Sequence, residues 1–176
     1  MQLDTCLLGD CRDSMRLMAT TEELAYCAGV IDSDGTIGVK RSTYAMRVVG
    51  DCQQPTFSER ICVKQVEPQA VDLLHRLFGG TRRMEDPSAK RGRSLHSWQV
   101  TDKRAAACLI AVLPYLRIKK QQAENCISLR SIKDKSKLDR VAFGRGHVGA
   151  AKRSPASSEA MEQHYLKAKE LNHVGV

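Results

Sequence analysis

The chain has 176 residues, which is enough for one well-filled domain and short for two. Lysine and arginine outnumber aspartate and glutamate by 28 to 20, so the formal net charge is +8, which favours a polyanionic partner. Aromatic residues make up only 5% of the chain, which argues against a protein that stacks single-stranded bases and favours a duplex.

The seven cysteines include no CxxC pair and no Cys/His spacing typical of a zinc site. No signal peptide is recognisable, so we expect free thiols in a reducing compartment and a protein that is not secreted. No apolar run approaches the length of a membrane span, which predicts that no membrane is involved.

Residues 1–20 are predicted to form an N-terminal extension of unclear role. Thr20 or Thr21 then caps the first clear helix, because two glutamates follow in its first turn, where acidic side chains are favoured. The apolar part of this helix covers residues 24–31, and it ends at the sequence Asp-Ser-Asp-Gly, residues 32–35.

Small and acidic residues give this helix two unusual features. Ala25, Ala28 and Gly29 lie at positions i, i+3 and i+4, so one face lacks bulk and another backbone can approach it. Asp32 and Asp34 lie at the C-terminal end, where the helix macrodipole disfavours a carboxylate by roughly 0.3–1 kcal/mol. A divalent cation would account for both acids. An ordinary exit from a helix into a turn is the alternative, and spacing alone leaves both interpretations open.

The following segments alternate between strand and helix patterns. A proline begins the second helix, two glycines end it, and a proline ends the third. The expected elements are strands at 36–41, 45–49 (a continuation of the first) and 60–66, a helix at 68–78, strands at 81–84 and 95–101, helices at 103–113 and 121–132, a loop over phosphates or a flexible linker at 133–158, and a last helix that Ser158 caps and that runs to about residue 171.

Two parts of the predicted sheet are basic. Residues 60–66 alternate polar and apolar side chains, so one face can pack while Arg60, Lys64 and Arg47 point outward. A two-stranded ribbon with a basic face fits the DNA major groove, although a solvated sheet face is the alternative. Residues 82–93 carry a second cluster of basic side chains at a ribbon tip, which suits phosphate contacts.

Residues 28–35, AGVIDSDG, resemble the signature of the LAGLIDADG homing endonucleases, with Cys27 where the family usually has leucine. Two further segments are similar to this family. Gln65 is followed by a helix that ends in Leu-Phe-Gly-Gly, and residues 113–123 carry a proline, an aromatic residue and a lysine-rich entry into a helix. The resemblance covers roughly residues 21–130.

The resemblance implies an α+β fold with an αββαββα core, in which a saddle-shaped antiparallel sheet lies on DNA. On this basis residues 21–132 form the endonuclease core, and residues 133–176 add a basic loop and C-terminal helix that complete the same domain. The motif occurs once and the sequence has no internal repeat, so the family resemblance implies a homodimer. Its interface would include Ala25, Ala28, Gly29 and Asp32; packing of the small-residue face on the protein's own sheet is the alternative.

The resemblance also assigns roles to site residues. Asp34 matches the metal-binding catalytic aspartate, and the backbone carbonyl of Ser33 would also face the metal. Gln65 matches a residue that positions a metal-bound water, and Lys119 matches the basic residue near the scissile phosphate. The resemblance gives Asp32 a structural role, in which it caps and hydrogen-bonds where the helices meet. Without the family, Gln65 is an ordinary strand end and Lys119 a solvated helix start. The implied metal is Mg²⁺, with Mn²⁺ or Ca²⁺ able to replace it for binding.

The implied function is a homing endonuclease that makes a metal-dependent double-strand break, with short 3′ overhangs, in a long and partly palindromic duplex. It would act inside the cell, together with DNA, in intron homing. Alternatives are a non-cleaving protein on the same scaffold, an intron maturase or a transcriptional regulator, and a basic structural protein of nucleoid or ribosome. The residues predicted to contact DNA are Lys40, Arg41, Arg47, Arg60, Lys64, Arg82, Arg83, Lys90, Arg91, Arg93, Arg117, Lys152 and Arg153.

Overall fold

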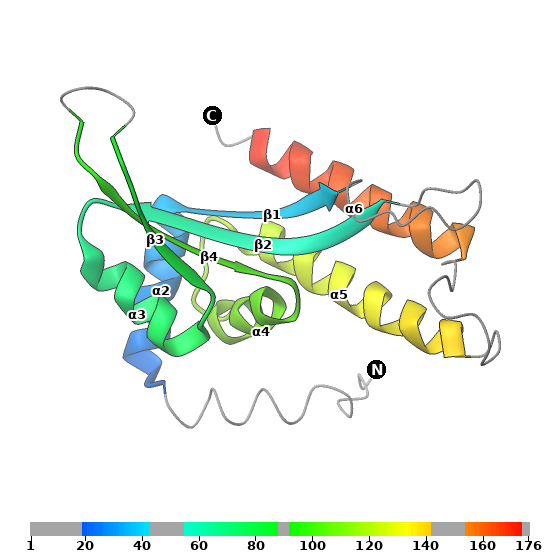
Figure 1. Cartoon of the computed structure of the whole chain (residues 1–176). Helices are drawn as coiled ribbons and strands as arrows, with labels where there is room; N and C mark the ends of the chain where they lie inside the picture. The colour runs from blue at the N-terminus through cyan, green and yellow to red at the C-terminus, as the bar shows by residue number, and fades with distance from the viewer. Residues whose placement is uncertain (1–18, 43–54, 88–91, 142–153, 174–176) are drawn as a thin grey trace.

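The structure is a computed structural model that describes residues 19–42, 55–87, 92–141 and 154–173. The elements carry the labels of Figure 1. In chain order they are α2 (Thr21–Asp34), β1 (Gly35–Ser42), β2 (Thr56–Gln65), α3 (Pro68–Phe78), β3 (Thr81–Glu85), β4 (Leu95–Thr101), α4 (Asp102–Val112), α5 (Lys120–Val141) and α6 (Pro155–His173).

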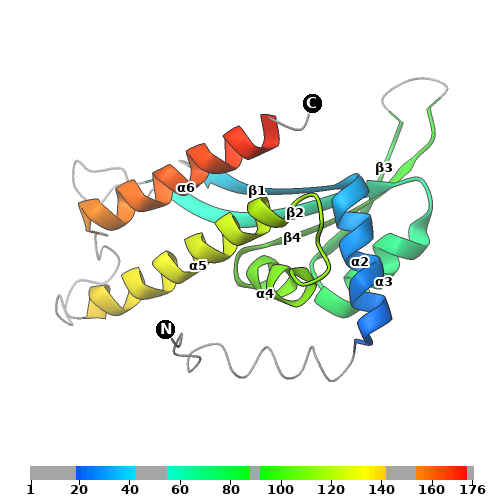
Figure 2. The same ribbon diagram turned by 180° about the vertical axis from the view of Figure 1, so that it is seen from behind.

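The four strands form one antiparallel sheet in the order β1-β2-β4-β3. Ile37 pairs with Ile61 in the β1–β2 register, and Val63 pairs with Trp98 in the β2–β4 register. Figures 1 and 2 show α2, α3, α4 and α5 together on one side of the sheet. The predicted α+β class and the αββαββα order are therefore confirmed, whereas the strand expected at residues 45–49 lies outside the described residues.

The hydrophobic core lies between this face of the sheet and the helices. Alternate strand residues point into it, as the two-residue period of a strand requires. Trp98 is fully buried, and its indole Nε1 donates a hydrogen bond to the Gly79 carbonyl at 2.7 Å. The largest buried side chains of the core are Ile31, Ile37, Ile61, Val63, Val71, Leu74, Phe78, Trp98 and Leu109.

Helix α2 has defined ends. At its start, Thr20 and Glu23 form a capping box, in which each side chain accepts a hydrogen bond from the other residue's backbone N–H. At its end, the chain turns directly into β1 at Gly35. A Cβ atom at Gly35 would lie 2.6 Å from the Ile31 carbonyl oxygen, so only glycine permits this tight turn. The turn places Asp34 at the end of the sheet.

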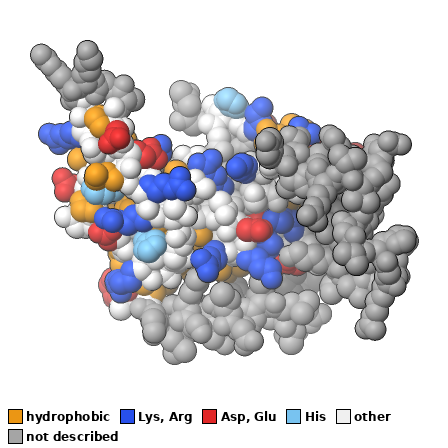
Figure 3. Space-filling view, in the orientation of Figure 1, with side chains coloured by type: hydrophobic (Ala, Val, Ile, Leu, Met, Phe, Trp, Pro, Cys, Tyr) orange, Lys and Arg blue, Asp and Glu red, His pale blue; other side chains and the backbone are white. Residues whose placement is uncertain are grey.

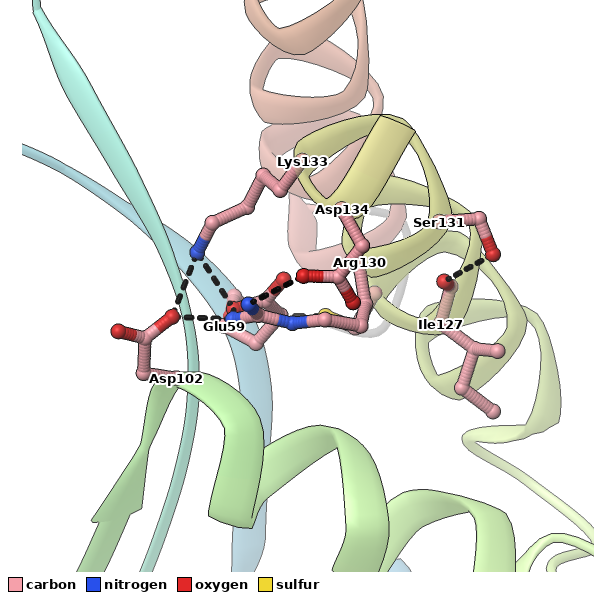
Figure 4. A network of polar contacts seen from close by, with 9 residues as sticks. Glu59, Asp102, Ile127, Arg130, Ser131, Lys133 and Asp134 are labelled. Atoms are coloured by element: carbon pink, nitrogen blue, oxygen red, sulfur yellow. Dashed lines mark hydrogen bonds and ion pairs between the residues drawn. The ribbon is translucent and has the colours of Figure 1, made fainter. Parts of the chain in front are cut away.

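Helix α5 is longer than the sequence predicted. We expected a basic loop from residue 133, but the helix continues to Val141. A network of charged side chains, buried at Glu59 and Arg130, joins residues 130–134 of this part of α5 to the sheet (Figure 4). Two of its acidic members, Glu59 of β2 and Asp102 at the start of α4, lie far away in the sequence. The helix is therefore stabilised by contacts that its own composition does not reveal.

The buried network consists of Glu59, Asp102, Arg130, Lys133 and Asp134. Glu59 is fully buried and Arg130 is 3% exposed. Glu59 Oε2 accepts hydrogen bonds from Arg130 Nη2 at 2.6 Å and from Lys133 Nζ at 2.9 Å. Asp102 also accepts from both cations, and Asp134 pairs with Arg130. Asp102 adopts φ 60°, a left-handed conformation that is uncommon outside glycine.

Helix α6 runs beside α5 and along the free edge of β1. Asn125 of α5 donates to the His164 carbonyl at 2.9 Å, and Asn172 donates to the Ile37 carbonyl at 3.1 Å. Met161 of α6 packs with Phe57 of β2 and Leu129 of α5, so α6 covers the edge of the sheet beside β1 (Figures 1 and 2). None of the helices described here is both long enough and apolar enough to cross a membrane.

Candidate active site and nucleic-acid interface

The end of α2 meets the entry to α5 through the carboxylate of Asp32. Its oxygens accept hydrogen bonds from the backbone N–H groups of Arg117, Ile118 and Lys119, at 2.6, 3.2 and 2.9 Å. Burial alone would raise the pKa of Asp32, but these three donors together hold it below its usual value. Asp32 therefore caps the segment that leads into α5, within a single chain.

Lys119 completes this junction in the opposite direction. Its ammonium donates to three backbone carbonyls at the end of α2, those of Ile31 at 3.0 Å, Asp32 at 2.6 Å and Ser33 at 3.3 Å. A cation at this position satisfies carbonyls left free at a helix C-terminus and opposes the negative end of the macrodipole. Burial lowers the pKa of Lys119 in spite of the nearby Asp32 and Asp34 charges. Each helix end is thus capped by a side chain from the other segment.

Asp34 differs from Asp32 because its carboxylate is exposed. Gln65 Nε2 donates to Asp34 Oδ2 at 2.8 Å, and Ser33 Oγ donates to the same oxygen at 3.2 Å. The predicted pair Asp34 and Gln65 is therefore brought together from α2 and the end of β2. Both residues line an open hollow of about 360 Å³, together with Lys64, Val66, Glu67 and Leu95.

The donor atoms at this end of α2 can hold a metal only together with other ligands. Among the residues that the structure describes, no three His, Cys, Asp or Glu side chains cluster as a complete metal site. Mg²⁺, however, is usually bound by one or two carboxylates, with waters and substrate phosphates as the remaining ligands. The exposed carboxylate of Asp34 and the carbonyl of Ser33 fit that partial role. The Lys119 ammonium already donates a hydrogen bond to the Ser33 carbonyl oxygen. A metal bound to this carbonyl would therefore share that oxygen with Lys119.

The sheet has a polar face opposite the helices. Because side chains alternate along a strand, Lys40, Arg60 and Lys64 share this face, whereas their neighbours Val39, Ile61 and Val63 pack towards the helices. Arg83 pairs with Ser97 and belongs to the same face. On the side seen in Figure 3, Lys and Arg side chains lie over the part of the surface formed by the strands.

Two of the predicted DNA contacts lie on the other face of the sheet. Arg41 forms an ion pair with Glu162 of α6 at 3.1 Å, and Arg82 forms one with Asp72 of α3 at 2.5 Å. Arg41 follows Lys40 directly, so the two cannot point to the same side of one strand. We therefore remove Arg41 and Arg82 from the set proposed to face the groove.

Solved structures of homing endonucleases share this architecture. I-CvuI in complex with its target is 22% identical, with a TM-score of 0.50, over 81% of this chain and 94% of that one. The intron-encoded I-CeuI complexed with DNA is 13% identical, with a TM-score of 0.51, over 89% and 83%. The LAGLIDADG enzyme I-GzeII in complex with a DNA target is 10% identical, with a TM-score of 0.53, over 83% and 43%.

The chain has the LAGLIDADG homing-endonuclease fold. The resemblance first seen in residues 28–35 is thus confirmed at the level of the fold. No family model matches the sequence, and no curated protein matches it either. The chain spans nearly all of I-CvuI but less than half of I-GzeII, so it corresponds to the whole of one chain and to part of the other.

Within this LAGLIDADG fold, the small residues of α2 divide between two faces. Ala28 is fully buried in the core of this chain, and Asp32 is turned towards α5. Ala25 and Gly29 are exposed, and a Cβ atom added to Gly29 would meet no described atom within 4 Å. Tyr26 beside them is 53% exposed. The face available to a second chain is therefore formed by Ala25, Tyr26 and Gly29 rather than by Ala28.

The remaining predicted contacts are distributed as follows. Arg93 is exposed near the start of β4, and Arg117 is exposed beside the junction of α2 and α5. The structure therefore leaves both free to face a ligand at the polar face or its end. The predicted contacts that lie outside the described residues are Arg47, Lys90, Arg91, Lys152 and Arg153.

Proposed function

We propose that the chain is a homing endonuclease that cuts both strands of a specific DNA duplex, with short 3′ overhangs and with a divalent metal. The observation that supports this most strongly is the position of Asp34. Its exposed carboxylate lies at the end of the sheet, beside a neutral amide from Gln65 and next to the basic polar face. We also propose that the protein acts on DNA inside the cell, in intron homing.

Asp34 and the carbonyl of Ser33 are the groups that would hold Mg²⁺, or Mn²⁺ or Ca²⁺ for binding. A bound metal supplies Lewis acidity, activates water as a nucleophile and neutralises charge on the phosphate. The protein contributes orientation. Gln65 fixes one oxygen of Asp34, and the cap on Asp32 fixes the backbone from which Asp34 projects. Gln65 would also position the attacking water.

Lys119 is proposed to stabilise charge on the scissile phosphate. Its ammonium lies at the end of α2, within hydrogen-bond distance of the Ser33 carbonyl and close enough to Asp34 to sense its charge. A phosphate bound beside Asp34 would therefore meet a fixed positive charge. Contact would require the ammonium to exchange one of its three carbonyl partners for a phosphate oxygen, and the Ser33 carbonyl, which is the longest contact, is the obvious one.

We further propose that two copies of the chain act together on a partly palindromic site. Each chain carries one signature motif, whereas cutting both strands needs two active centres. The exposed face formed by Ala25, Tyr26 and Gly29 would bring two α2 helices together about a twofold axis. Two Asp34 side chains would then lie near each other, at the centre of the bound duplex.

A bulky substitution tests this interface. A Cβ atom at Gly29 would meet no described atom within 4 Å, and leucine is a better helix former than glycine, so we expect the Gly29→Leu monomer to fold normally. At the proposed contact the same side chain overpacks the interface by typically 1–3 kcal/mol. Sedimentation should show a dimer for the natural chain, a shift to monomer for Gly29→Leu, and little change for Gly29→Ala. A Gly29→Leu chain that remains dimeric would contradict the α2 interface.

The function is tested by selection and cleavage. Duplexes with a long randomised segment are selected for binding in Ca²⁺, and the enriched sequence is then incubated with the protein in Mg²⁺. We expect a partly palindromic sequence to emerge and to be cut on both strands. Specific binding without cleavage in Mg²⁺ or Mn²⁺ would instead support a maturase or a regulator. Binding without any sequence enrichment would support a structural protein that relies on charge.

A further inference from the structure

The polar face of the sheet is bounded on one side by α6. A hollow of about 410 Å³ lies where the C-terminal part of this helix meets β1 and β2. The residues that line it are Thr36, Gly38, Val39, Lys40, Arg60, Cys62, Lys64, Ala168, Lys169 and Asn172.

The charged residues that line this hollow are all basic. Lys40, Arg60 and Lys64 reach it from the sheet, and Lys169 reaches it from α6, whereas no acidic residue is among its described lining residues. Lys64 is already paired with Glu85 at 2.6 Å on the side towards β3. Lys169 of α6 therefore adds a positive charge to the hollow, beside those of Lys40 and Arg60 from the strands.

The α6 wall is held firmly in place. Asn172 donates to the Ile37 carbonyl at the edge of β1, and Ala168 is 4% exposed. A Cβ atom at Gly38 would lie 3.3 Å from Asn172 Nδ2, so the glycine allows the helix to approach the strand closely. Further along, Glu162 pairs with Arg41. Lys169 therefore projects from a fixed backbone and not from a loose terminus.

We propose that α6 forms one wall of the DNA-binding groove and that Lys169 binds a backbone phosphate of the duplex there. This inference rests on the proposed function. Lysine binds phosphate as a point charge and carries no information about base sequence. The strand residues beneath it, Lys40 and Arg60, can reach base edges, whereas the helix at the edge of the sheet meets the outside of the duplex. Lys169 thus positions the DNA and does not read it.

The helix offers a matched control. Lys167 is exposed on α6 and lies two residues from Lys169, but it lines a different hollow with Gln163, His164, Leu166 and Glu170. Lys167→Gln and Lys169→Gln therefore remove the same charge from the same helix. A side chain that acts only through the net charge of the protein should matter equally at both positions. A phosphate contact in the hollow should matter only at Lys169.

Binding of the selected duplex and of an unrelated duplex is measured against salt concentration for the natural chain and for both variants. We expect Lys169→Gln to weaken both complexes several-fold and to reduce the slope of log affinity against log salt by about 0.9, the value for one lost phosphate contact. Lys167→Gln should leave the slope unchanged, and Lys169→Arg should keep it. Circular dichroism checks that each variant is folded.

Cys62 gives a second readout, because it is a partly exposed free thiol in the same hollow. Its alkylation, followed by peptide mass spectrometry, should be slowed by bound DNA in the natural chain. Equal slopes for the natural chain, Lys167→Gln and Lys169→Gln would overturn the α6 wall while leaving DNA binding intact. No protection of Cys62, which shares the face of β2 with Arg60 and Lys64, would overturn binding over this part of the sheet together with the α6 wall. A natural chain that binds no duplex at all would overturn the proposed function and this inference together.

Discussion

The molecule contains two clusters of polar side chains, the buried network around Glu59 and the junction between α2 and α5, and they differ in how their charges are paired. The buried network places Glu59 and Arg130 almost entirely out of water, with cations and carboxylates paired to each other. The junction between α2 and α5 also contains a capped carboxylate, Asp32. Two residues later, however, Asp34 is exposed and is contacted by the neutral donors Gln65 and Ser33.

The difference separates structural charge from charge available for chemistry. In the buried network, each carboxylate contacts a cation of the protein, so its negative charge is compensated within the fold. At Asp34, an amide and a hydroxyl orient the carboxylate without compensating its charge. A carboxylate at a helix C-terminus opposes the macrodipole, so its presence there suggests a requirement other than stability. Whether a carboxylate is available for chemistry is therefore indicated by the kind of partner that contacts it, and not by the number of charges in its cluster.

The largest effect is expected for Asp34→Asn. If the carboxylate holds a metal, its loss should reduce the cleavage rate on the order of 10³-fold, because metal catalysis is worth several kcal/mol. The fold should not change, since the residue is exposed. Binding of the selected duplex should survive, even with EDTA present. Cleavage and binding are measured on the same protein sample.

Asp72→Asn is the matched control for this change. It also converts an exposed helical aspartate to the amide, but it affects only the ion pair with Arg82 on the helix side of the sheet. Its cleavage rate should equal that of the natural chain. Full nicking by Asp34→Asn would remove Asp34 from the catalytic centre, and loss of folding would make it a structural residue.

Glu59→Gln should break the other cluster. Arg130 and Lys133 would lose their shared buried carboxylate, and breaking a buried pair typically costs 3–5 kcal/mol. The amide retains some hydrogen bonding, so we expect a loss of about 3 kcal/mol in the free energy of unfolding, measured in urea. Cleavage per folded molecule should not change. Glu85→Gln, which disrupts an exposed pair with Lys64, should be much less destabilising.

Sequence reasoning succeeded where the information is local. The apolar segment of α2, the glycines after α3 and the signature at residues 28–35 identified the order of elements. The family resemblance also assigned Asp34 and Gln65 to one site, and the structure brings them into contact. Sequence reasoning did not succeed where a helix is stabilised by residues that lie far away in the sequence. The part of α5 around Arg130 is held by Glu59 and Asp102, which are 71 and 28 residues away in the sequence.

The sequence also did not reveal which face of a strand or helix packs against the rest of the chain. Lys40 and Arg41 are equally basic, and only the strand register shows that the second points to α6. The small residues of α2 pose the same problem, because helical spacing groups Ala25, Ala28 and Gly29 but does not say which of them the core covers. For the strand and for the helix, the missing information is which side of the element packs against the rest of the chain.

Asp32→Ala should have an intermediate effect. The change removes the acceptor for three backbone N–H groups at the entry to α5 and one of the two carboxylates near Lys119. We expect a loss of about 2 kcal/mol in the free energy of unfolding. Thr20→Ala, which removes the cap at the other end of α2, should cost about 1 kcal/mol. Equal losses would mean that the α2–α5 junction is no more than an ordinary helix cap.

The smallest expected effect is the dependence of stability on acid at Asp102. Burial would raise the pKa of this carboxyl, but hydrogen bonds from Lys133 and Arg130 outweigh it and lower the pKa to about 2 from 3.8. A depressed pKa means that Asp102 stabilises the fold above pH 3.8 and that this contribution is lost as the pH falls towards 2. Its side chain is 60% exposed, so water screens the pair and we expect about 1 kcal/mol.

Urea unfolding of the natural chain and of Asp102→Asn between pH 5 and pH 2.5 measures this contribution. The natural chain should lose more stability over the interval than the variant, because only the natural chain takes up a proton at this position on acidification. The two curves should therefore converge at low pH. Parallel curves would show that Asp102 adds no stability and that Glu59 and Asp134 supply the carboxylates of the network. In that case the fully buried Glu59 would be the main carboxylate of the network, and its contrast with the exposed Asp34 would become sharper.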